Sequence, residues 1–443
     1  MGTQMGERAE LFLLPTDKDG GYAIIERDDL ANLVASKLRG DRYDEVPEWT
    51  VLESEALNHA VGIGNRMAKE MGQPAIAAKI AASVSASSTA NLINTLQFTL
   101  KTHKPKGQVD IRVIHACANH PHTGAGIVIN QLIERNLGSK KFLCKNTKDF
   151  LQHVRSQRWS SEDIWTKLEI KDFYMDGTHE CMIDKTFIDC DLSNGQTHES
   201  KNLLAHVLYH QYVRNPITNR VYRVVRGSGM GMNWSGHVSD KVLFEIVEKN
   251  TMVDDAWSNN HQIKMYTRFR DDIVLACKGQ LNNAMVYRQM ILDTRGQYEV
   301  RCEAISKTVM ENLDVQLSKS SSGKVVTKPF FKTTEQKVPL TVRSLHPRHV
   351  HSSWPVANIF RLRALSSNAR VFFAARKRYA LNTYCMPWMP MPSNRHPGST
   401  TPPLLPDPIG GMIGTMSIRC SCSMSILVLA AVPTAIGASK HCG

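Results

Sequence analysis

Apolar residues recur at intervals of three and four from about residue 51. The segment LESEALNHAVGIGNRMAKEM (52–71) has this spacing, and AIAAKIAASVSASSTANLINTL (75–96) continues it with small residues. Such a period is typical of helices with one apolar face. We therefore expect helices from about 51 to 100, and again over 121–157, after a charged N-terminal extension.

The centre of the chain, from about 160 to 315, alternates between two patterns. IWTKLEIKDFYM (164–175) favours a strand, and QIKMYTRFRDDIVLAC (262–277) favours a strand, a turn and a second strand. Helical patterns lie between and after them, at 199–215, 236–250 and 282–298. The alternation predicts an α+β fold in which helices pack on an antiparallel sheet.

Two further segments differ from this pattern. LKTHKPKGQVDIRVI (100–114) places basic residues around proline and glycine before a β-branched run, which predicts a basic, hairpin-like flap. After about residue 385 the chain becomes rich in proline, and this composition predicts disorder.

The charge of the chain is one-sided. Lys and Arg number 54 against 41 Asp and Glu, which gives +13, while the apolar fraction of 42% fits a globular protein. Residues 341–380 contain no acidic residue but many arginines. An excess of this kind favours nucleic acid as a partner, the alternative being a basic protein that its charge keeps soluble.

The N-terminus, the apolar runs and the cysteines bear on the location of the protein and on metal binding. The chain does not open on a secretory signal, and its long apolar run (424–438) is too short to span a bilayer. We therefore expect an intracellular protein that does not enter a membrane. The ten cysteines form no CxxC pair, so no zinc site is predicted.

The segment RFRDDIVL (268–275) places Asp271 and Asp272 side by side within an apolar run. Adjacent buried carboxylates repel each other, and a bound divalent cation would offset that cost. Mg²⁺ is commonly held by one or two carboxylates together with substrate phosphates. TKLEIKDFYMDG (166–177) supplies Glu169 and Asp172 as further carboxylates, whereas an ordinary surface turn is the alternative explanation for the doublet.

Six segments between about 93 and 366 resemble, in order, the motifs of reverse transcriptases, most closely those of Penelope-like retroelements. The basic flap resembles the fingers segment, LEIKDFYM the first palm motif, MGMNWSG (230–236) the MGSPLSP motif, and FRDDI (269–273) the Y-x-D-D hairpin. ENLDVQL (311–317) with TKPFFKTTEQKVPL (327–340), and SLHPRHVHSSW (344–354), resemble the segments that lead into the thumb.

The resemblance implies a right-hand polymerase: fingers (60–158), a palm with an antiparallel sheet (159–335) and a basic helical thumb (336–385). An N-terminal extension (1–59) would precede them, and a tail (386–443) would follow. The implied activity is RNA-directed DNA synthesis on an RNA or DNA template with a primer, using dNTPs and two Mg²⁺ ions, with Mn²⁺ as a possible replacement. We expect a nuclear location, and the sequence leaves the oligomeric state open.

The resemblance also implies roles for single residues. Glu169, Asp271 and Asp272 would hold the metal ions, and Lys307 would protonate pyrophosphate. The incoming triphosphate would be gripped by Lys101 and Arg112, with Asp172 and Phe173 along its path. Tyr174 would exclude a ribose 2′-hydroxyl, and Gly231 would let the backbone approach the nucleotide. Phosphates of the template–primer duplex would contact the thumb residues Arg361, Arg363, Arg376, Lys377 and Arg378.

One position departs from the family, because Glu169 stands where its first palm motif carries aspartate. The extra methylene moves the carboxylate by about 1.5 Å, and a misplacement of ~1 Å can cost ~10²-fold in rate. A slow enzyme, a manganese-preferring enzyme and a catalytically impaired, nucleic-acid-binding remnant all remain open. A ribonucleotide polymerase is a further alternative, against which Tyr174 argues.

Overall fold

The computed structural model describes the central part of the chain almost completely. It describes residues 10–17, 21–46, 53–85, 92–101, 109–117, 119–253, 255–279, 282–293, 298–330, 347–384, 416–419 and 425–429. The chain forms two compact units. One unit contains 31–98 and 113–330, and the other contains 1–30, 99–112 and 331–443. The predicted palm therefore shares a unit with most of the predicted fingers, while the predicted thumb belongs to the other unit.

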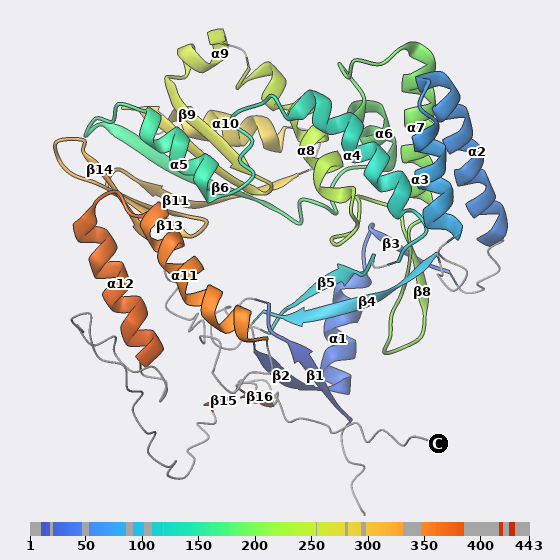
Figure 1. The fold of residues 1–443 in the computed structure, drawn as a ribbon, viewed down its shortest axis with the longest axis horizontal. Helices are drawn as coiled ribbons and strands as arrows, with labels where there is room; N and C mark the ends of the chain where they lie inside the picture. Colours follow the sequence, from blue (N-terminus) through green and yellow to red (C-terminus); the bar gives the residue numbers. More distant parts are fainter. Residues whose placement is uncertain are drawn as a thin grey trace, which may run out of the picture. The chain divides into compact units, whose positions relative to one another are not determined.

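A four-stranded antiparallel sheet forms the centre of the larger unit. Its order is β11 (Glu299–Ser306), β6 (Asp163–Lys171), β10 (Asp272–Lys278) and β9 (Ile263–Phe269). Figure 1 shows β6, β9 and β11 side by side, although they come from distant parts of the sequence. The predicted strands at 164–175 and 262–277 are confirmed, including the turn between β9 and β10.

The two faces of this sheet differ in what covers them. Alternate residues of β6 and β10, among them Leu168 and Ile273, are fully buried in one core. Helices α8 (Ser235–Ile246) and α10 (Asn282–Leu292) complete that core, for example through Leu243 and Ile291. On the opposite face Trp165 is fully buried, whereas Glu169 is only half-buried. That face is therefore partly open at the end where β6 finishes.

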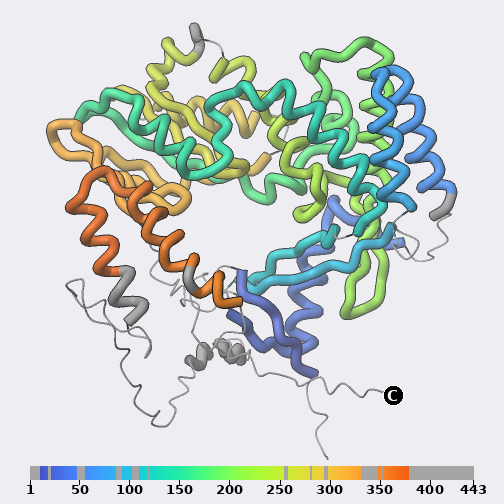
Figure 2. The backbone as a smooth tube through the Cα atoms, viewed as in Figure 1, coloured from blue at the N-terminus to red at the C-terminus, as the bar shows by residue number. Residues whose placement is uncertain are grey.

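Helices make up the adjoining part of the same unit. Helices α2 (Glu53–Met71) and α3 (Pro74–Ser85) pack as a pair, and α4 (Thr123–Leu137), α6 (His179–Thr186) and α7 (Asn194–Tyr209) contribute to one shared apolar core. Figure 2 shows α2 and α3 in blue beside α7 in green. The periodic apolar residues of 52–71 therefore do form a helix, as predicted.

A five-stranded sheet corrects two helical predictions. Its order is β3 (Tyr43–Val46), β8 (Val221–Val224), β7 (Tyr212–Arg214), β4 (Ile93–Leu100) and β5 (Ile111–His115). The helix expected up to about 100 ends at Ser85, and the helix expected over 199–215 ends at Tyr209. Both failures occur where the sequence changes to β-branched and aromatic residues, which pack well on a pleated sheet.

Short elements complete the larger unit. A three-stranded antiparallel sheet contains β12 (Val309–Asn312), β13 (Val315–Lys319) and β14 (Val325–Pro329). Helix α5 (Thr147–Ser156) contacts β9, as does the short helix α9 (Asp255–Asn260). Within the described residues, no helix has both the length and the apolar character required to cross a membrane.

The smaller unit contains a sheet and two helices. The sheet order is β1 (Leu11–Pro15), β2 (Tyr22–Glu26), β16 (Ser425–Leu429) and β15 (Met416–Arg419). Helix α1 (Arg27–Leu38) begins in this unit, which also contains α11 (Arg348–Leu365) and α12 (Ala369–Tyr384). Strands β15 and β16 lie in the tail for which disorder was predicted, so the structure differs from that prediction at these residues. The rest of 386–443, most of the flap (102–108) and 331–346 lie outside the described residues.

Candidate active site

Strand pairing brings the two predicted carboxylate segments together. Asp272 on β10 is directly opposite Glu169 on β6, and the backbone N–H of Ile170 donates to the carbonyl oxygen of Asp271 at 3.0 Å. Residues paired in this way in an antiparallel sheet have Cα atoms about 4.5–5.5 Å apart and project from the same face. Asp271, Asp272 and Glu169 are all half-buried, at the end of the sheet that remains partly open.

The turn that carries Asp271 is held by the helix behind it. Arg270, at the first position of the turn, has a φ of +57°, a left-handed conformation that is uncommon for arginine. Its guanidinium pairs with Asp240 on α8 and packs directly over Gly236, where a Cβ atom would lie 2.8 Å from Cζ of Arg270. Gly236 therefore leaves the space that this contact needs.

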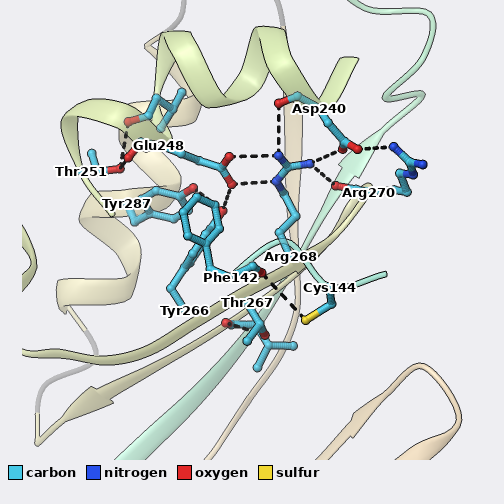
Figure 3. Close-up of polar contacts among 12 residues, drawn as sticks. Phe142, Cys144, Asp240, Glu248, Thr251, Tyr266, Thr267, Arg268, Arg270 and Tyr287 are labelled. Atoms are coloured by element: carbon cyan, nitrogen blue, oxygen red, sulfur yellow. Dashed lines mark hydrogen bonds and ion pairs between the residues drawn. The ribbon is translucent and has the colours of Figure 1, made fainter. Parts of the chain in front are cut away.

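A second, buried arginine also connects the hairpin to α8. Arg268 on β9 donates to both carboxylate oxygens of Glu248, at 2.7 and 2.9 Å, and to Oδ1 of Asp240 at 2.6 Å. Figure 3 shows Glu248, Arg268, Asp240 and Arg270 as one continuous chain of contacts. Burial alone would lower the pKa of Arg268, but Glu248 and Asp240 raise it, so the guanidinium stays charged. These contacts fix the hairpin against α8.

The open face of the sheet carries a further carboxylate, that of Glu303. Glu303 belongs to β11 and lies at a register shift between Cys302 and Ala304. Lys167 lies two residues before Glu169 on β6 and projects from the same face. It contacts Glu303 at 2.6 Å and Asp272 at 3.4 Å. The sequence analysis missed both Lys167 and Glu303, and for Glu303 no signal existed, because its position depends on the bulge in β11.

The electrostatics of this cluster are those of crowded like charges. Burial raises the pKa of Glu169, the negative charges of Glu303 and Asp272 raise it further, and Lys167 opposes them. A cation beside Glu169 would relieve this repulsion, so the donor set has the chemistry of a Mg²⁺ site. Within the described ranges, however, no group of three or more His, Cys, Asp and Glu side chains is arranged to hold a metal ion by itself.

The loop after β6 carries the residues predicted to face the nucleotide. Asp172 is exposed, with a φ of +50°, and Phe173 is buried over the guanidinium of Arg268. Tyr174 is half-buried, and its carbonyl oxygen accepts a hydrogen bond from the N–H of Ser228 at 2.6 Å. The loop is therefore joined both to the hairpin and to the glycine-rich segment RGSGMGMNWSG (226–236).

Gly231 lies in that glycine-rich segment, where the backbone is crowded. It has a φ of +112°, and a Cβ atom there would lie 2.4 Å from the carbonyl oxygen of His115. The neighbouring Met230 accepts a hydrogen bond from the N–H of His115 at 2.7 Å. Any side chain at position 231 would separate these two backbones, so the local packing is sufficient to explain why glycine is required there.

The structure also brings an unpredicted arginine to the loop. Arg42, just before β3, pairs with Asp172 and with Asp176, at 2.8 Å in each case. Burial raises the pKa of Asp176 to about 6 although Arg42 opposes this shift. Sequence reasoning had no signal for Arg42, which lies in a mixed, charged segment 130 residues before Asp172.

The predicted triphosphate-binding cations belong to the other compact unit. Lys101 pairs with Asp110 at 3.0 Å, and Arg112 pairs with Asp17 at 2.8 Å. Both partners are in the same unit as the cation that they hold.

The structure places Lys307 away from the carboxylate end of β6, beside Glu162. Lys307 follows β11 and contacts Glu162 at 3.5 Å. Glu162 is the residue just before the start of β6. Glu169 is seven residues further along the strand, and a strand rises about 3.3 Å per residue. Glu162, the partner of Lys307, is therefore roughly 20 Å from Glu169 along the strand.

The predicted duplex-binding residues lie on two helices of the smaller unit. Arg361 and Arg363 are exposed on α11. Three more basic residues are exposed on α12: Arg376, Lys377 and Arg378. The expectation of basic helices over 354–380 is confirmed for these elements.

Comparison with solved structures identifies the fold. Telomerase from Candida albicans, in complex with a TWJ fragment of telomeric RNA, matches with a TM-score of 0.50 and 10% identity, over 80% of this chain and 58% of that chain. Apo telomerase from Candida tropicalis matches at 0.47 and 9% identity, over 71% of this chain and 56% of that one. A BmCPV RNA-dependent RNA polymerase matches at 0.42 and 10% identity, over 75% and 30%.

These likenesses show the fold alone. The latter two, below a TM-score of 0.5, are too weak to carry the assignment, and the chain spans a little over half the length of the telomerase chains. No protein-family model matches the chain, and no curated protein matches it. Together with the antiparallel sheet and its hairpin, the first match shows the fold class: the chain has the α+β fold of right-hand, reverse-transcriptase-like polymerases.

Proposed function

We propose that this chain is an RNA-directed DNA polymerase of a Penelope-like retroelement. The observation that carries the proposal is the register of β6 and β10, in which Asp272 is opposite Glu169 and next to Asp271. Three carboxylates from stretches a hundred residues apart thus share one end of a sheet. The ordered motifs of the sequence support the retroelement origin, from which a nuclear location would follow.

The proposed reaction transfers a nucleotidyl group. The 3′-oxygen of a primer attacks the α-phosphorus of a dNTP and gives its proton to water, a new P–O bond forms, and the bond to the leaving pyrophosphate breaks. Two Mg²⁺ ions, when bound, would activate the 3′-hydroxyl and neutralise the leaving pyrophosphate. Glu169, Asp271 and Asp272 would hold these ions together with the substrate phosphates, as carboxylates commonly do for Mg²⁺.

The remaining roles follow from the motifs. Tyr174 would lie against the sugar and exclude a 2′-hydroxyl, while Asp172 and Phe173 would line the triphosphate path. Lys101 and Arg112 would grip the triphosphate in exchange for the carboxylates that they now contact. The exposed arginines and lysine of α11 and α12 would neutralise duplex phosphates without reading base sequence.

The test is primer extension by the purified chain. With a primed RNA template, dNTPs and Mg²⁺ or Mn²⁺, we expect incorporation that Asp271→Ala abolishes, because the substitution removes a metal-holding carboxylate. Arg220→Gln, which changes an exposed side chain that pairs with Glu45, is the matched control and should retain activity. A wild-type chain that extends no primer with either metal contradicts the proposal.

One observation favours a second candidate, a non-catalytic nucleic-acid-binding protein. Lys167 contacts Asp272 and Glu303, so a protein cation already neutralises part of the cluster, and Glu169 replaces the aspartate of the motif. This candidate predicts salt-sensitive duplex binding that survives Asp271→Ala, without incorporation. Filter binding beside the extension assay separates the two functions.

A further inference from the structure

We propose that Arg42 is a positioning residue of the nucleotide site, whose guanidinium joins the two ends of the loop 172–176 and so fixes Tyr174. The inference rests on the proposed polymerase function for its effect on selectivity. The contacts of Arg42 with Asp172 and Asp176, called the clamp below, are a property of the folded chain, so they can be tested without catalysis.

The geometry of the clamp is that of a bridge. Nη1 of Arg42 donates to Oδ2 of Asp172 at 2.8 Å, and Nη2 donates to Oδ1 of Asp176 at 2.8 Å. Charge-assisted bonds from the two ends of one planar guanidinium are directional, so they restrain both carboxylates together. Because both terminal amino groups are engaged with carboxylates, Arg42 acts on the loop and not directly on a substrate.

The loop needs such a restraint because its backbone conformation is uncommon. Asp172 has a φ of +50°, a region that non-glycine residues rarely occupy, although aspartate tolerates it better than most. The N–H of Met175 donates to the carbonyl oxygen of Asp172 at 2.7 Å, which closes the turn. Tyr174 lies inside this turn, so its position depends on how firmly Asp172 and Asp176 are held.

The backbone of Arg42 is itself held, by the residue that follows β8. Its carbonyl oxygen accepts a hydrogen bond from the N–H of Val225 at 3.0 Å. The next residue, Tyr43, contacts Nε2 of His115 through its hydroxyl at 2.9 Å, and the N–H of His115 donates to Met230. The guanidinium therefore has a fixed base, and it links the loop to the segment that carries Gly231.

The charge environment makes the pairing more than a surface contact. Asp176 is buried, with 8% of its side chain exposed, and a pair with a buried partner costs more to break than an exposed pair. Desolvation raises the pKa of Asp176 to about 6, so at neutral pH its charge depends on Arg42, with Arg226 as a second cation nearby. Without the guanidinium, Asp176 protonates more readily and holds the loop less firmly.

Selectivity is the readout that a merely structural role would not change. In Arg42→Gln we expect the ratio of kcat/KM for a dNTP over its rNTP to fall on the order of tenfold, since a misplacement of ~1 Å can cost ~10²-fold. Arg220→Gln, just before β8, is the control and should leave the dNTP-to-rNTP ratio unchanged. Asp172→Asn, at an exposed side chain, serves as a second variant if Arg42→Gln fails to fold.

Hydrogen exchange tests the clamp independently of catalysis. In the full chain without nucleotide, Arg42→Gln should speed amide exchange in a peptide covering 171–178, whereas Arg220→Gln should not. Unchanged exchange overturns the clamp, and faster exchange with an unchanged dNTP-to-rNTP ratio overturns the positioning of Tyr174. If the wild-type chain incorporates no nucleotide, the polymerase proposal fails together with the selectivity claim, and the exchange result still decides whether Arg42 holds the loop.

Discussion

At the scale of single residues, the site depends on how like charges are separated. Glu169 shares its end of the sheet with Asp272 and Glu303, and burial together with these charges raises its pKa. Lys167 acts in the opposite direction and lowers the pKa of Glu169. The lysine therefore helps to keep Glu169 ionised, and only the ionised carboxylate can hold a metal ion.

Replacing Lys167 should move the pH dependence of incorporation. In Lys167→Met the pKa of Glu169 rises further, so the acidic limb of the pH–rate profile should shift to higher pH. Lys171→Met is the control, because Lys171 pairs with Glu299 at the edge of the same face. A profile of kcat/KM against pH for the three chains is the measurement, and an identical acidic limb in all of them would exclude the role of Lys167.

Arg268 should contribute strongly to stability. Arg268→Met removes the partner of Glu248, which is fully buried, and leaves an uncompensated carboxylate, a change that typically costs about 3–5 kcal/mol. Arg301→Met changes an exposed arginine on β11 and should cost less than about 1 kcal/mol. Urea unfolding measures both, and similar free energies of unfolding for the two variants would disprove the importance of the buried pair.

At the scale of elements, histidines form an unusual contact between helices. His122, just before α4, lies 5.0 Å from His206 on α7, measured between ring centroids, and His206 lies 5.2 Å from His59 on α2. Neither ring nitrogen of His122 or His206 has a hydrogen-bond partner in the described residues. Burial lowers the pKa of His206 to about 3 and that of His120 to about 4, and it lowers that of His122 as well.

Acidification should therefore loosen these helices. The unfolded chain binds protons at these histidines below about pH 6.5, but the folded chain does not until about pH 4, so stability present at neutral pH is lost as the pH falls. Each histidine contributes a loss of about 1.4 kcal/mol per pH unit in this window. Urea titrations from pH 7 to 5 should show a weaker slope in His122→Phe than in wild type, with exposed His198→Gln as control. A slope unaffected by His122→Phe contradicts this account.

The same scale shows what the sequence could and could not predict. The palm strands were predictable because Leu168, Ile170, Ile273 and Leu275 follow the period of a strand and the Asp-Asp doublet marks the turn. The end of α3 was not, because the small residues of 75–96 suit a helix until β4 begins, and only pairing with β7 decides the outcome. Glu303 and Arg42 depended on a bulge and on a contact across 130 residues, neither of which has a local signal.

At the scale of the whole molecule, the exposed basic residues of α11 and α12 should make duplex binding depend on salt. Five basic residues are exposed on α11 and α12, in a stretch without acidic residues. If each contacts one phosphate, their replacement by glutamine should reduce the slope of log K against log salt by about 0.9 per residue. Duplex binding measured from 50 to 300 mM salt tests this, and an unchanged slope would mean that these helices do not contact the duplex.

The central claim is that Glu169 acts with Asp271 and Asp272 at the open end of the sheet. The most direct test is single-nucleotide incorporation on a primed RNA template with Mg²⁺, compared between wild type, Glu169→Asp and Glu169→Gln. We expect slow incorporation by wild type, faster incorporation by up to ~10²-fold in Glu169→Asp, which restores the shorter carboxylate, and none in Glu169→Gln. Incorporation by Glu169→Gln at the wild-type rate would contradict the account.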